Sequence, residues 1–305
     1  MANLTTQLCG LTLKNPVLAS SGTFGYGLEL DSILDLNALG GFVVKGLSLE
    51  PIAGNKAPRV TETAAGMLNS IGLQNVGVEA FVREKLPKLA ELDTAVFANV
   101  FGYAPEDYVE VLRRLEDAEG LGGYELNVSC PNTKHGGMQF GADPQLLGEV
   151  VGMARRAVTR RPLMVKLSPN VTDIAQMAKA AQEAGADAIS LINTVQAMAV
   201  DARTRKPKIG AGMGGLSGPA VKPIALRMVY QAAKAVTIPV VGMGGVATGE
   251  DVAEFLLCGA AAVQVGTASF WDPKSPQRIA RELDRFLDGQ SINSSAELVG
   301  RLEMP

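Results

Sequence analysis

Short apolar runs alternate with amphipathic stretches along most of the chain. Eight of these runs are rich in Val, Ile, Leu, Ala and Phe, and short apolar runs between turn signals are typical of buried strands. We expect strands at residues 17–20, 42–45, 95–100, 124–129, 163–167, 188–192, 239–242 and 262–265. Two further short segments, on either side of Cys9-Gly10 within residues 4–13, predict a β-hairpin ahead of the first strand.

The stretches between the strands carry helix start and stop signals. Charged side chains fall on one face and apolar side chains on the other, as in helices that cover one side of a sheet. Three predicted helices begin at a proline or a capping residue and end before a glycine: Pro105 to Gly120, Thr172 to Gly185, and Thr248, in a capping box with Asp251, to Gly259.

Eight strand–helix units with right-handed crossovers close into a (β/α)8 TIM barrel of the α/β class. A doubly wound open sheet is the alternative, but its first turn should carry a GxGxxG motif, and none follows residues 17–20. Three connections are too long for simple loops, and all follow strand ends, where barrels place their binding sites: residues 47–78, 131–143 and 195–219. No linker divides the chain, so we predict one domain over residues 1–305.

The composition narrows the functional classes. The net charge of −3 provides no basic surface for nucleic acid, and no apolar run approaches the roughly 18 residues of a membrane span. Residues 1–7 lack the features of a signal peptide, and three widely spaced cysteines suit a reducing compartment without a CxxC metal site. We therefore expect a cytoplasmic protein. His135 is the only histidine, which disfavours chemistry that needs two of them.

Two lysines stand at the ends of apolar strands. Lys45 and Lys166 would both project toward the mouth of the barrel, where an ammonium group is costly to desolvate unless an anion meets it. One possibility is that each pairs with a core carboxylate. Glu125 is the only acid that these strands and their neighbours supply, so we prefer a bound anionic ligand.

Glycines follow the last two predicted strands. Backbone N–H groups can approach a phosphate closely at Gly244-Gly245 and at Gly266-Thr267, because glycine has no Cβ, and barrels commonly bind phosphate at this position. Gly218 could contribute from the connection after the sixth strand. The pattern predicts a phosphorylated ligand.

Cys130 is the candidate catalytic base. It stands at the end of the fourth strand, ahead of a loop that Gly136-Gly137 could allow to close over it, and thiolate character would need cationic or dipolar help. A buried structural thiol is the alternative, and it is our interpretation of Cys9 and Cys258. His135 in the same loop is either a partner of Cys130 or a solvated side chain.

Four asparagines, Asn69, Asn127, Asn132 and Asn193, are expected to surround the site. Amides supply both donors and acceptors, which suits a flat, polar, heterocyclic substrate with alternating C=O and N–H groups. The alternative is that some of them only hold loops, Asn132 above all.

Several of these segments resemble dihydroorotate dehydrogenases. The similarity covers essentially the whole barrel in order, from SSGTFG at residues 20–25 to VGT at residues 265–267. Between them it includes NSIGLQN at 69–75, NVSCPN at 127–132, VKLSPN at 165–170, LINT at 191–194 and GMGG at 242–245.

The resemblance implies a barrel with one FMN that oxidises (S)-dihydroorotate to orotate in de novo pyrimidine biosynthesis. It implies that Cys130 removes a proton from C5 while a hydride passes from C6 to N5 of FMN. The implied substrate residues are Lys45, Asn69, Ser70, Ile71, Gly72, Leu73, Asn127, Asn193 and Thr194. The implied FMN residues are Ser21, Lys45, Gly46, Asn99, Asn127, Lys166, Ile192, Gly218, Gly244, Gly245, Gly266 and Thr267.

The resemblance also points to one electron acceptor. The membrane-bound, quinone-reducing class has a serine base and an extra N-terminal segment, whereas this chain has Cys130 and no such segment. The sequence TKHGGMQFG at residues 133–141 is similar to the NAD-linked class, 1B, whose catalytic subunit works with a partner that carries FAD and a 2Fe–2S cluster. We therefore expect a homodimeric core with this partner in a heterotetramer.

Other functions stay open at this point. The homodimeric, fumarate-reducing class, 1A, shares the cysteine base but usually has a different loop that contains Pro, Gly and Lys. A flavin enzyme for uracil-type dihydropyrimidines would leave Lys45 without an anionic partner, and a dihydrouridine synthase would need a basic surface for tRNA. From a different class, the chain could be a non-catalytic flavin-binding subunit of a redox complex.

Overall fold

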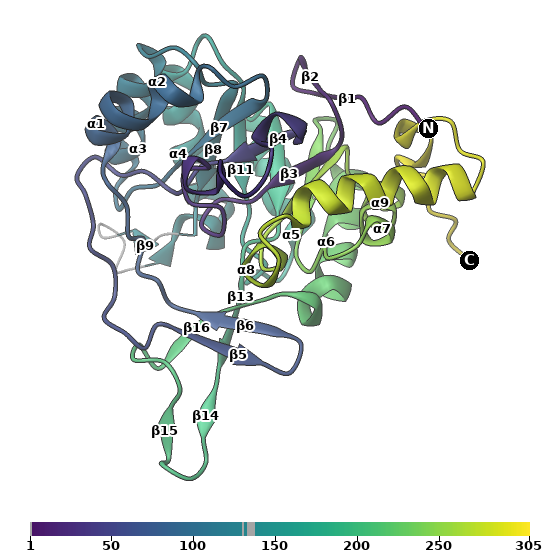
Figure 1. Cartoon of the computed structure of the whole chain (residues 1–305). Coiled ribbons are helices and arrows are strands. Elements are labelled where there is room, and N and C mark those ends of the chain that lie inside the picture. The colour runs from purple at the N-terminus through teal and green to yellow at the C-terminus, as the bar shows by residue number, and fades with distance from the viewer. Residues whose placement is uncertain (1, 130, 133–137) are drawn as a thin grey trace.

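Eight parallel strands close into a barrel at the centre of the molecule (Figure 1). This computed structural model describes residues 2–129, 131, 132 and 138–305. In order around the barrel the strands are β3 (Val17–Ala19), β4 (Gly41–Val43), β7 (Ala95–Val100), β8 (Gly123–Asn127), β11 (Leu163–Lys166), β12 (Ala188–Leu191), β17 (Val240–Met243) and β18 (Ala262–Val265). β18 pairs with β3 and completes the ring, so the predicted (β/α)8 fold class is confirmed.

All eight predicted strands are present, and they differ from the prediction only at their ends. β7 and β18 have the predicted bounds. β4 ends at Val43, so Lys45 lies just beyond the strand and not within it. The difference is small because every strand is buried on both faces, and its apolar run therefore marks it clearly in the sequence.

Helices cover the outside of the barrel. They are α1 (Val78–Ala80), the π-helical turn η3 (Phe81–Lys85) and α2 (Leu86–Leu89), which follow one another directly, then α3 (Pro105–Glu116), α4 (Pro144–Ala157), α5 (Ile174–Glu183), α6 (Lys222–Ala235), α7 (Gly249–Leu257), α8 (Ala268–Trp271) and α9 (Ser275–Gly289). Short 3-10 turns lie at Leu28–Leu30, Leu36–Ala38, Phe140–Ala142, Pro219–Val221 and Ser295–Leu298. Within the described ranges, no helix is long and apolar enough to cross a membrane.

The helix caps agree with the sequence signals at α3 and α7 but differ at α5. Thr248 and Asp251 form the predicted capping box of α7. The prediction of Thr172 as the N-cap of α5 is wrong by one residue. The cap is Asp173, because its carboxylate accepts the backbone N–H groups of Ala175 and Gln176 at 2.9 and 3.1 Å.

The N-terminal hairpin, β1 (Thr6–Leu8) and β2 (Leu11–Leu13), confirms the prediction for residues 4–13 and closes one end of the barrel. Leu8 and Leu13 of the hairpin belong to a small apolar core with one residue from each of several barrel strands. These strand residues are Leu18, Val43, Phe97, Met164, Ala188, Val241 and Ala262. The larger core lies between the strands and the helices.

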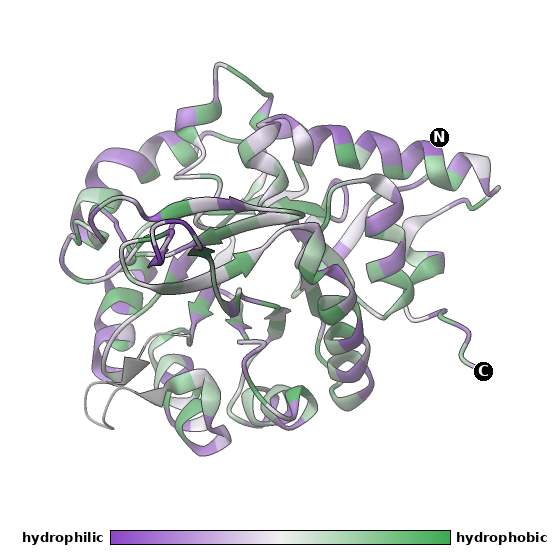
Figure 2. Ribbon diagram, turned by 90° about the horizontal axis from the view of Figure 1, so that it is seen from below, coloured by the Kyte–Doolittle hydropathy of each residue, from purple (hydrophilic) through white to green (hydrophobic). Residues whose placement is uncertain are grey.

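The long connections build an antiparallel sheet at the opposite end. Its order is β13 (Val195–Met198), β16 (Met213–Ser217), β6 (Gly66–Asn69) and β5 (Val60–Thr63). Figure 2 shows this sheet lying across the barrel, and Figure 1 shows a small hairpin of β14 (Val200–Asp201) and β15 (Lys206–Pro207) projecting beyond it. A two-residue pair, β9 (Pro131–Asn132) and β10 (Met138–Gln139), lies in the remaining long connection. The sequence predicts the long connections but not the sheet.

Replacing Asp251 with alanine should lower the free energy of unfolding by about 1 kcal/mol or more, because it removes a helix cap and an ion pair. The carboxylate accepts the N–H groups of Ala247 and Thr248 at 2.8 Å each and lies 2.5 Å from Lys222 Nζ. Burial acts to raise the pKa of Asp251, but the Lys222 and backbone hydrogen bonds outweigh it and the pKa is lowered.

A lowered folded-state pKa makes this contribution present above the ordinary aspartate pKa, about 4, and it is lost as the pH falls through the lowered value. Urea unfolding of both proteins should therefore show a constant difference from pH 8 to pH 5 and a shrinking one below about pH 4. Glu250→Ala, at an exposed position of the same first turn, is the control and should change little. A difference that stays undiminished at pH 3 would contradict the role of the charge.

Candidate active site

A cavity of about 390 Å³ opens at the carboxyl ends of the barrel strands, next to the antiparallel sheet. Every predicted site residue within the described ranges lines it. From the predicted substrate set these are Lys45, Asn69, Ser70, Ile71, Gly72, Leu73, Asn127, Asn193 and Thr194. From the predicted cofactor set the others are Ser21, Gly46, Asn99, Lys166, Ile192, Gly218, Gly244, Gly245, Gly266 and Thr267. Cys130 and His135 lie outside the described residues, as does the side chain of Asn132.

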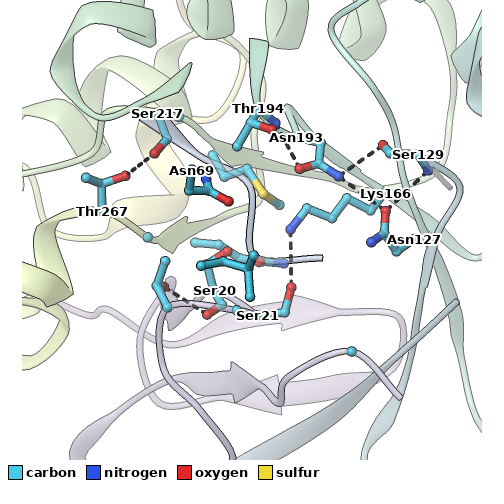
Figure 3. A pocket seen from close by; sticks show the side chains of 18 of the residues that line it. Ser20, Ser21, Asn69, Asn127, Ser129, Lys166, Asn193, Thr194, Ser217 and Thr267 are labelled. Atoms are coloured by element: carbon cyan, nitrogen blue, oxygen red, sulfur yellow. Dashed lines mark hydrogen bonds between the residues drawn. The ribbon is translucent and has the colours of Figure 1, made fainter. Parts of the chain in front are cut away.

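A buried ion pair lies at the bottom of the cavity. Lys166 Nζ is 3.7 Å from Glu125 Oε1, and the two side chains are 7% and 0% exposed. Lys166 also donates to Ser21 Oγ at 3.3 Å, and Figure 3 shows its ammonium group directed toward that hydroxyl. At Lys166 we predicted a bound anion in preference to a core carboxylate, and this preference is wrong, because Lys166 does pair with a core carboxylate. Asn127 of β8 is the register partner of Lys166, so Glu125, two residues earlier, points to the same side.

Lys45 is the second cation of the cavity and has no ion-pair partner in the part of the chain that the structure describes. Burial, followed by the nearby positive charge of Arg59, lowers the pKa of Lys45, although Glu29 acts in the other direction. A half-buried ammonium group without a counter-ion favours a ligand that brings a negative charge. At Lys45 the expectation of an anionic ligand is retained.

Amide side chains form a connected group on one side of the cavity. Asn193 Nδ2 donates to Asn127 Oδ1 at 3.2 Å and to Ser129 Oγ at 3.0 Å, while Asn193 Oδ1 accepts the N–H of Thr194 at 2.8 Å (Figure 3). Asn69, on β6, donates to the Gly215 carbonyl at 3.3 Å. These bonds fix the orientation of the amides, and within the described part of the chain they leave Asn127 Nδ2 and Asn69 Oδ1 as a donor and an acceptor for a ligand.

Glycines bring three backbone segments close together on the other side of the cavity. Gly218, Gly244 and Gly245 have φ values of +100°, +122° and +84°, which other residues adopt only with strain. A Cβ on Gly245 would lie 2.9 Å from the Gly218 carbonyl oxygen, and a Cβ on Gly218 would lie 2.6 Å from Gly66 Cα. Thr267 Oγ1 donates to Ser217 Oγ at 2.8 Å beside them. The predicted phosphate segments therefore meet at one place.

Gln264 is a cavity residue that the sequence interpretation missed. Its Nε2 donates to Glu125 Oε2 at 2.7 Å, whereas its buried Oε1 has no hydrogen-bond partner among the described residues. A buried acceptor without a donor is unfavourable by about 1–3 kcal/mol, so this atom favours a ligand with a hydroxyl or N–H group. The available signal was the polar residue inside the apolar strand 262–265. Ser217 and Phe270 also line the cavity, and they were missed because they lie outside the ends of the eight predicted strands.

The two described cysteines have the properties of structural thiols. Burial, and then the negative charge of Asp187, raises the pKa of Cys9 to about 12. Burial, and then Glu254, raises the pKa of Cys258. A raised pKa keeps a thiol protonated and unreactive near neutral pH. Among the described residues, no group of three or more His, Cys, Asp and Glu is placed to hold a metal ion.

Comparison with known proteins identifies the family. The sequence profile of the family described as dihydroorotate dehydrogenase matches residues 3–287, which is most of the chain. The chain belongs to the dihydroorotate dehydrogenase family. The resemblance stated from the sequence motifs is thereby confirmed, and with it the class of enzyme, a flavin-dependent oxidoreductase, since enzymes of this family bind FMN.

Relatives of the chain carry two different functional names. A protein from Solibacter usitatus, named putative dihydroorotate dehydrogenase A (fumarate), is 67% identical over 98% of both chains. A protein from Pelobacter propionicus, named dihydroorotate dehydrogenase B (NAD(+)), catalytic subunit, is 53% identical over 99% of both chains. A protein from Citrifermentans bemidjiense with the same NAD-linked name is 52% identical over 99% of both. The names therefore agree on the dehydrogenase and differ on the acceptor.

Replacing Gly245 with alanine should destabilise the protein by about 2 kcal/mol or more. A left-handed backbone costs alanine roughly 1–2 kcal/mol, and the new Cβ would also lie only 2.8 Å from Lys222 Cβ. The matched control is Gly148→Ala in α4, where the added Cβ meets no atom within 4 Å and helix propensity favours alanine by up to about 1 kcal/mol. Urea midpoints should therefore move in opposite directions, and a stable Gly245→Ala protein would show that the glycine is not required.

Proposed function

We propose that this chain oxidises (S)-dihydroorotate to orotate with bound FMN, in de novo pyrimidine biosynthesis. The observation that supports it most is that the segments that carry the family resemblance come together in one cavity. Figure 3 places Ser217 and Thr267 on one side of this cavity and Asn127, Ser129 and Asn193 on the other. A phosphate-bearing cofactor and a polar heterocyclic substrate each have a half with suitable chemistry.

The first half suits FMN. The glycine segments at Gly218, Gly244 and Gly245 offer backbone N–H groups to a phosphate, and Gln264 Oε1 offers an acceptor to a ribityl hydroxyl. Lys166 is the cation that would lie against the electron-rich edge of the ring. When bound, FMN supplies the acceptor for the hydride that leaves C6 of the substrate.

The second half suits dihydroorotate. Lys45 would bind the substrate carboxylate, because it is half-buried and has no counter-ion within the described ranges. Asn127 and Asn69 would meet the ring amides with a donor and an acceptor atom that no other described residue engages. Asn193 holds Asn127 and Ser129 in place, since both hydrogens of its Nδ2 are already used. The amide set therefore orients the substrate through positions that are fixed before it binds.

The proposed base is Cys130, the residue after the cavity residue Ser129. Its thiolate would take the proton from C5, which is acidified by the adjacent carbonyl group, as the hydride leaves C6 and the C5–C6 double bond forms. General base catalysis of this kind typically contributes a factor of about 10²–10⁴. Neither Cys9 nor Cys258 can substitute, because both have raised pKa values and lie outside the cavity lining.

Cys130→Ala should bind FMN normally and lose about 10²–10⁴-fold in the rate of flavin reduction by dihydroorotate near pH 7. Anaerobic stopped-flow bleaching of the flavin measures this step directly. Cys9→Ala is the control thiol and should keep the wild-type rate. Bleaching of Cys130→Ala at the wild-type rate would contradict the assignment of the base. A wild-type protein whose flavin is not bleached at all would instead support a non-catalytic flavin-binding subunit.

Lys45→Met should raise the KM for dihydroorotate by about tenfold or more, because a charge-assisted hydrogen bond contributes roughly 1.5–3 kcal/mol. The lowered pKa of Lys45 also gives the direction of the pH dependence. Substrate affinity should fall as the pH rises through that lowered value, because the ammonium group then becomes neutral. Lys179→Met, at an exposed position of α5, is the matched control. An unchanged KM, or an affinity that rises with alkaline pH, would rule out the proposed contact.

For the electron acceptor we propose NAD, reached through a partner subunit that carries FAD and a 2Fe–2S cluster, in a heterotetramer on a homodimeric core. The resemblance of residues 133–141 to the NAD-linked class supports this, and so do the names of the relatives at 52–53% identity. The rival function, fumarate reduction by the chain alone, is favoured by the name of the relative at 67% identity. Residues 133–137 lie outside the described residues, so the choice rests on sequence.

Affinity purification from the native cells distinguishes the two acceptors. The NAD-linked function predicts that a second chain with FAD and iron–sulfur absorbance co-purifies. It also predicts that the complex forms NADH when dihydroorotate is added, and that the isolated chain turns over little with fumarate. Turnover with fumarate at a rate comparable to flavin reduction, without any co-purified flavoprotein, would establish the fumarate-linked function in its place.

A further inference from the structure

The carboxylate of Glu125 is fully buried beside the cavity, yet the proposed function gives it no role. Its Oε1 accepts from Asn99 Nδ2 at 2.7 Å and from Ser21 Oγ at 3.4 Å, with Lys166 Nζ at 3.7 Å. Its Oε2 accepts from Gln264 Nε2 at 2.7 Å and from Ser190 Oγ at 2.9 Å. We call these six residues the Glu125 network.

We propose that Glu125 is a positioning residue for the flavin: it orients the cavity-facing donors of its network and offsets part of the charge of Lys166. The identity of the cofactor in this inference rests on the proposed function. The ion pair itself does not, and it can be tested in the protein without cofactor.

The first argument concerns orientation. Four members of the network, Ser21, Asn99, Lys166 and Gln264, line the cavity, whereas Ser190 and Glu125 do not. A carboxylate only accepts hydrogen bonds, so it selects the NH₂ end of each amide that meets it. Gln264 must therefore turn its Oε1 away from Glu125, and that atom is the buried acceptor without a partner among the described residues. Glu125 thus decides that the amide offers the cavity an acceptor.

The second argument concerns charge. Without Glu125, Lys166 would be a 7% exposed cation with only neutral partners in its network. Such a cation gains strongly from any anion that enters the cavity, and a reduced flavin carries more negative charge than an oxidised one. By pairing with Lys166, Glu125 limits how much the cavity prefers the reduced cofactor. The network therefore sets the flavin potential, and Lys166 alone does not.

The test in the cofactor-free protein is a double-mutant cycle on unfolding. Glu125→Gln and Lys166→Met should each lower the urea midpoint, because each leaves one buried charge without its partner. The double variant removes both charges, so its loss should be clearly smaller than the sum of the two single losses. Ser190→Ala is the control, since it removes a donor to the same carboxylate without changing any charge. Losses that simply add would overturn the ion pair as the basis of the proposal.

The test with FMN compares the dissociation constants of the oxidised and reduced cofactor. In Glu125→Gln the preference for reduced FMN should rise about tenfold or more, equivalent to about 30 mV in a two-electron potential. In Lys166→Met the preference for reduced FMN should fall. When Glu125→Gln is added to Lys166→Met, this preference should change by less than half of the change that Glu125→Gln causes in the wild-type protein. Ser190→Ala should stay within about twofold. No change in Glu125→Gln, or the same change in both backgrounds, would overturn the proposal.

Two further measurements keep the outcome unambiguous. If Glu125→Gln does not fold, Glu125→Asp can replace it, because it keeps the charge but moves it away from Lys166. A smaller shift in the same direction is then expected, and the absence of any shift would overturn the proposal. Bleaching of the wild-type flavin by dihydroorotate tests the proposed function separately. Its failure, or a lack of FMN binding, would reject that function while the unfolding cycle still decides whether Glu125 and Lys166 are coupled.

Discussion

The site depends on one geometrical constraint: parallel strands that close into a barrel bring all their carboxyl ends to the same opening. Inside the barrel, residues two apart along a strand point to the same side and lie one layer apart. The lower layer is apolar, with Phe97, Met164 and Ala262 packed against the N-terminal hairpin. Two residues further along the same strands, the chain has Asn99, Lys166 and Gln264. The cavity is thus the upper layer of the barrel, where apolar side chains give way to polar ones.

Much of this could be predicted from the sequence, because the strands are buried on both faces and leave unbroken apolar runs. Residues 95–100 and 262–265 mark their strands without error, and the glycines and amides at strand ends mark the mouth. What could not be predicted depends on pairing between distant segments. The antiparallel sheet joins residues 60–69 to residues 195–217, and neither segment shows its partner in its own sequence. The same holds for Glu125 and Lys166, whose contact follows from the strand order and register.

The two acceptor names among the relatives fit this division of the molecule. The proposed oxidation takes place in the cavity, whose described lining residues come from the barrel ends, the sheet and the loops and turns that adjoin them. The relatives at 67% and at 53% identity share the dehydrogenase name and differ in the acceptor that is named. High overall identity to a relative therefore says more about the dehydrogenase reaction than about the molecule that receives the electrons.

The strand β16 connects the two halves of the cavity. Ser217, the last residue of β16, accepts a hydrogen bond from the hydroxyl of Thr267 beside the glycine segments. Gly218 follows and lies close to Gly66. Two residues earlier on the same strand, the Gly215 carbonyl accepts the amide of Asn69. A ligand in either half of the cavity would therefore meet residues that the same short strand holds in place. Any coupling that this strand transmits between the two proposed ligands would be reciprocal: whatever the cofactor adds to substrate affinity, the substrate adds to cofactor affinity.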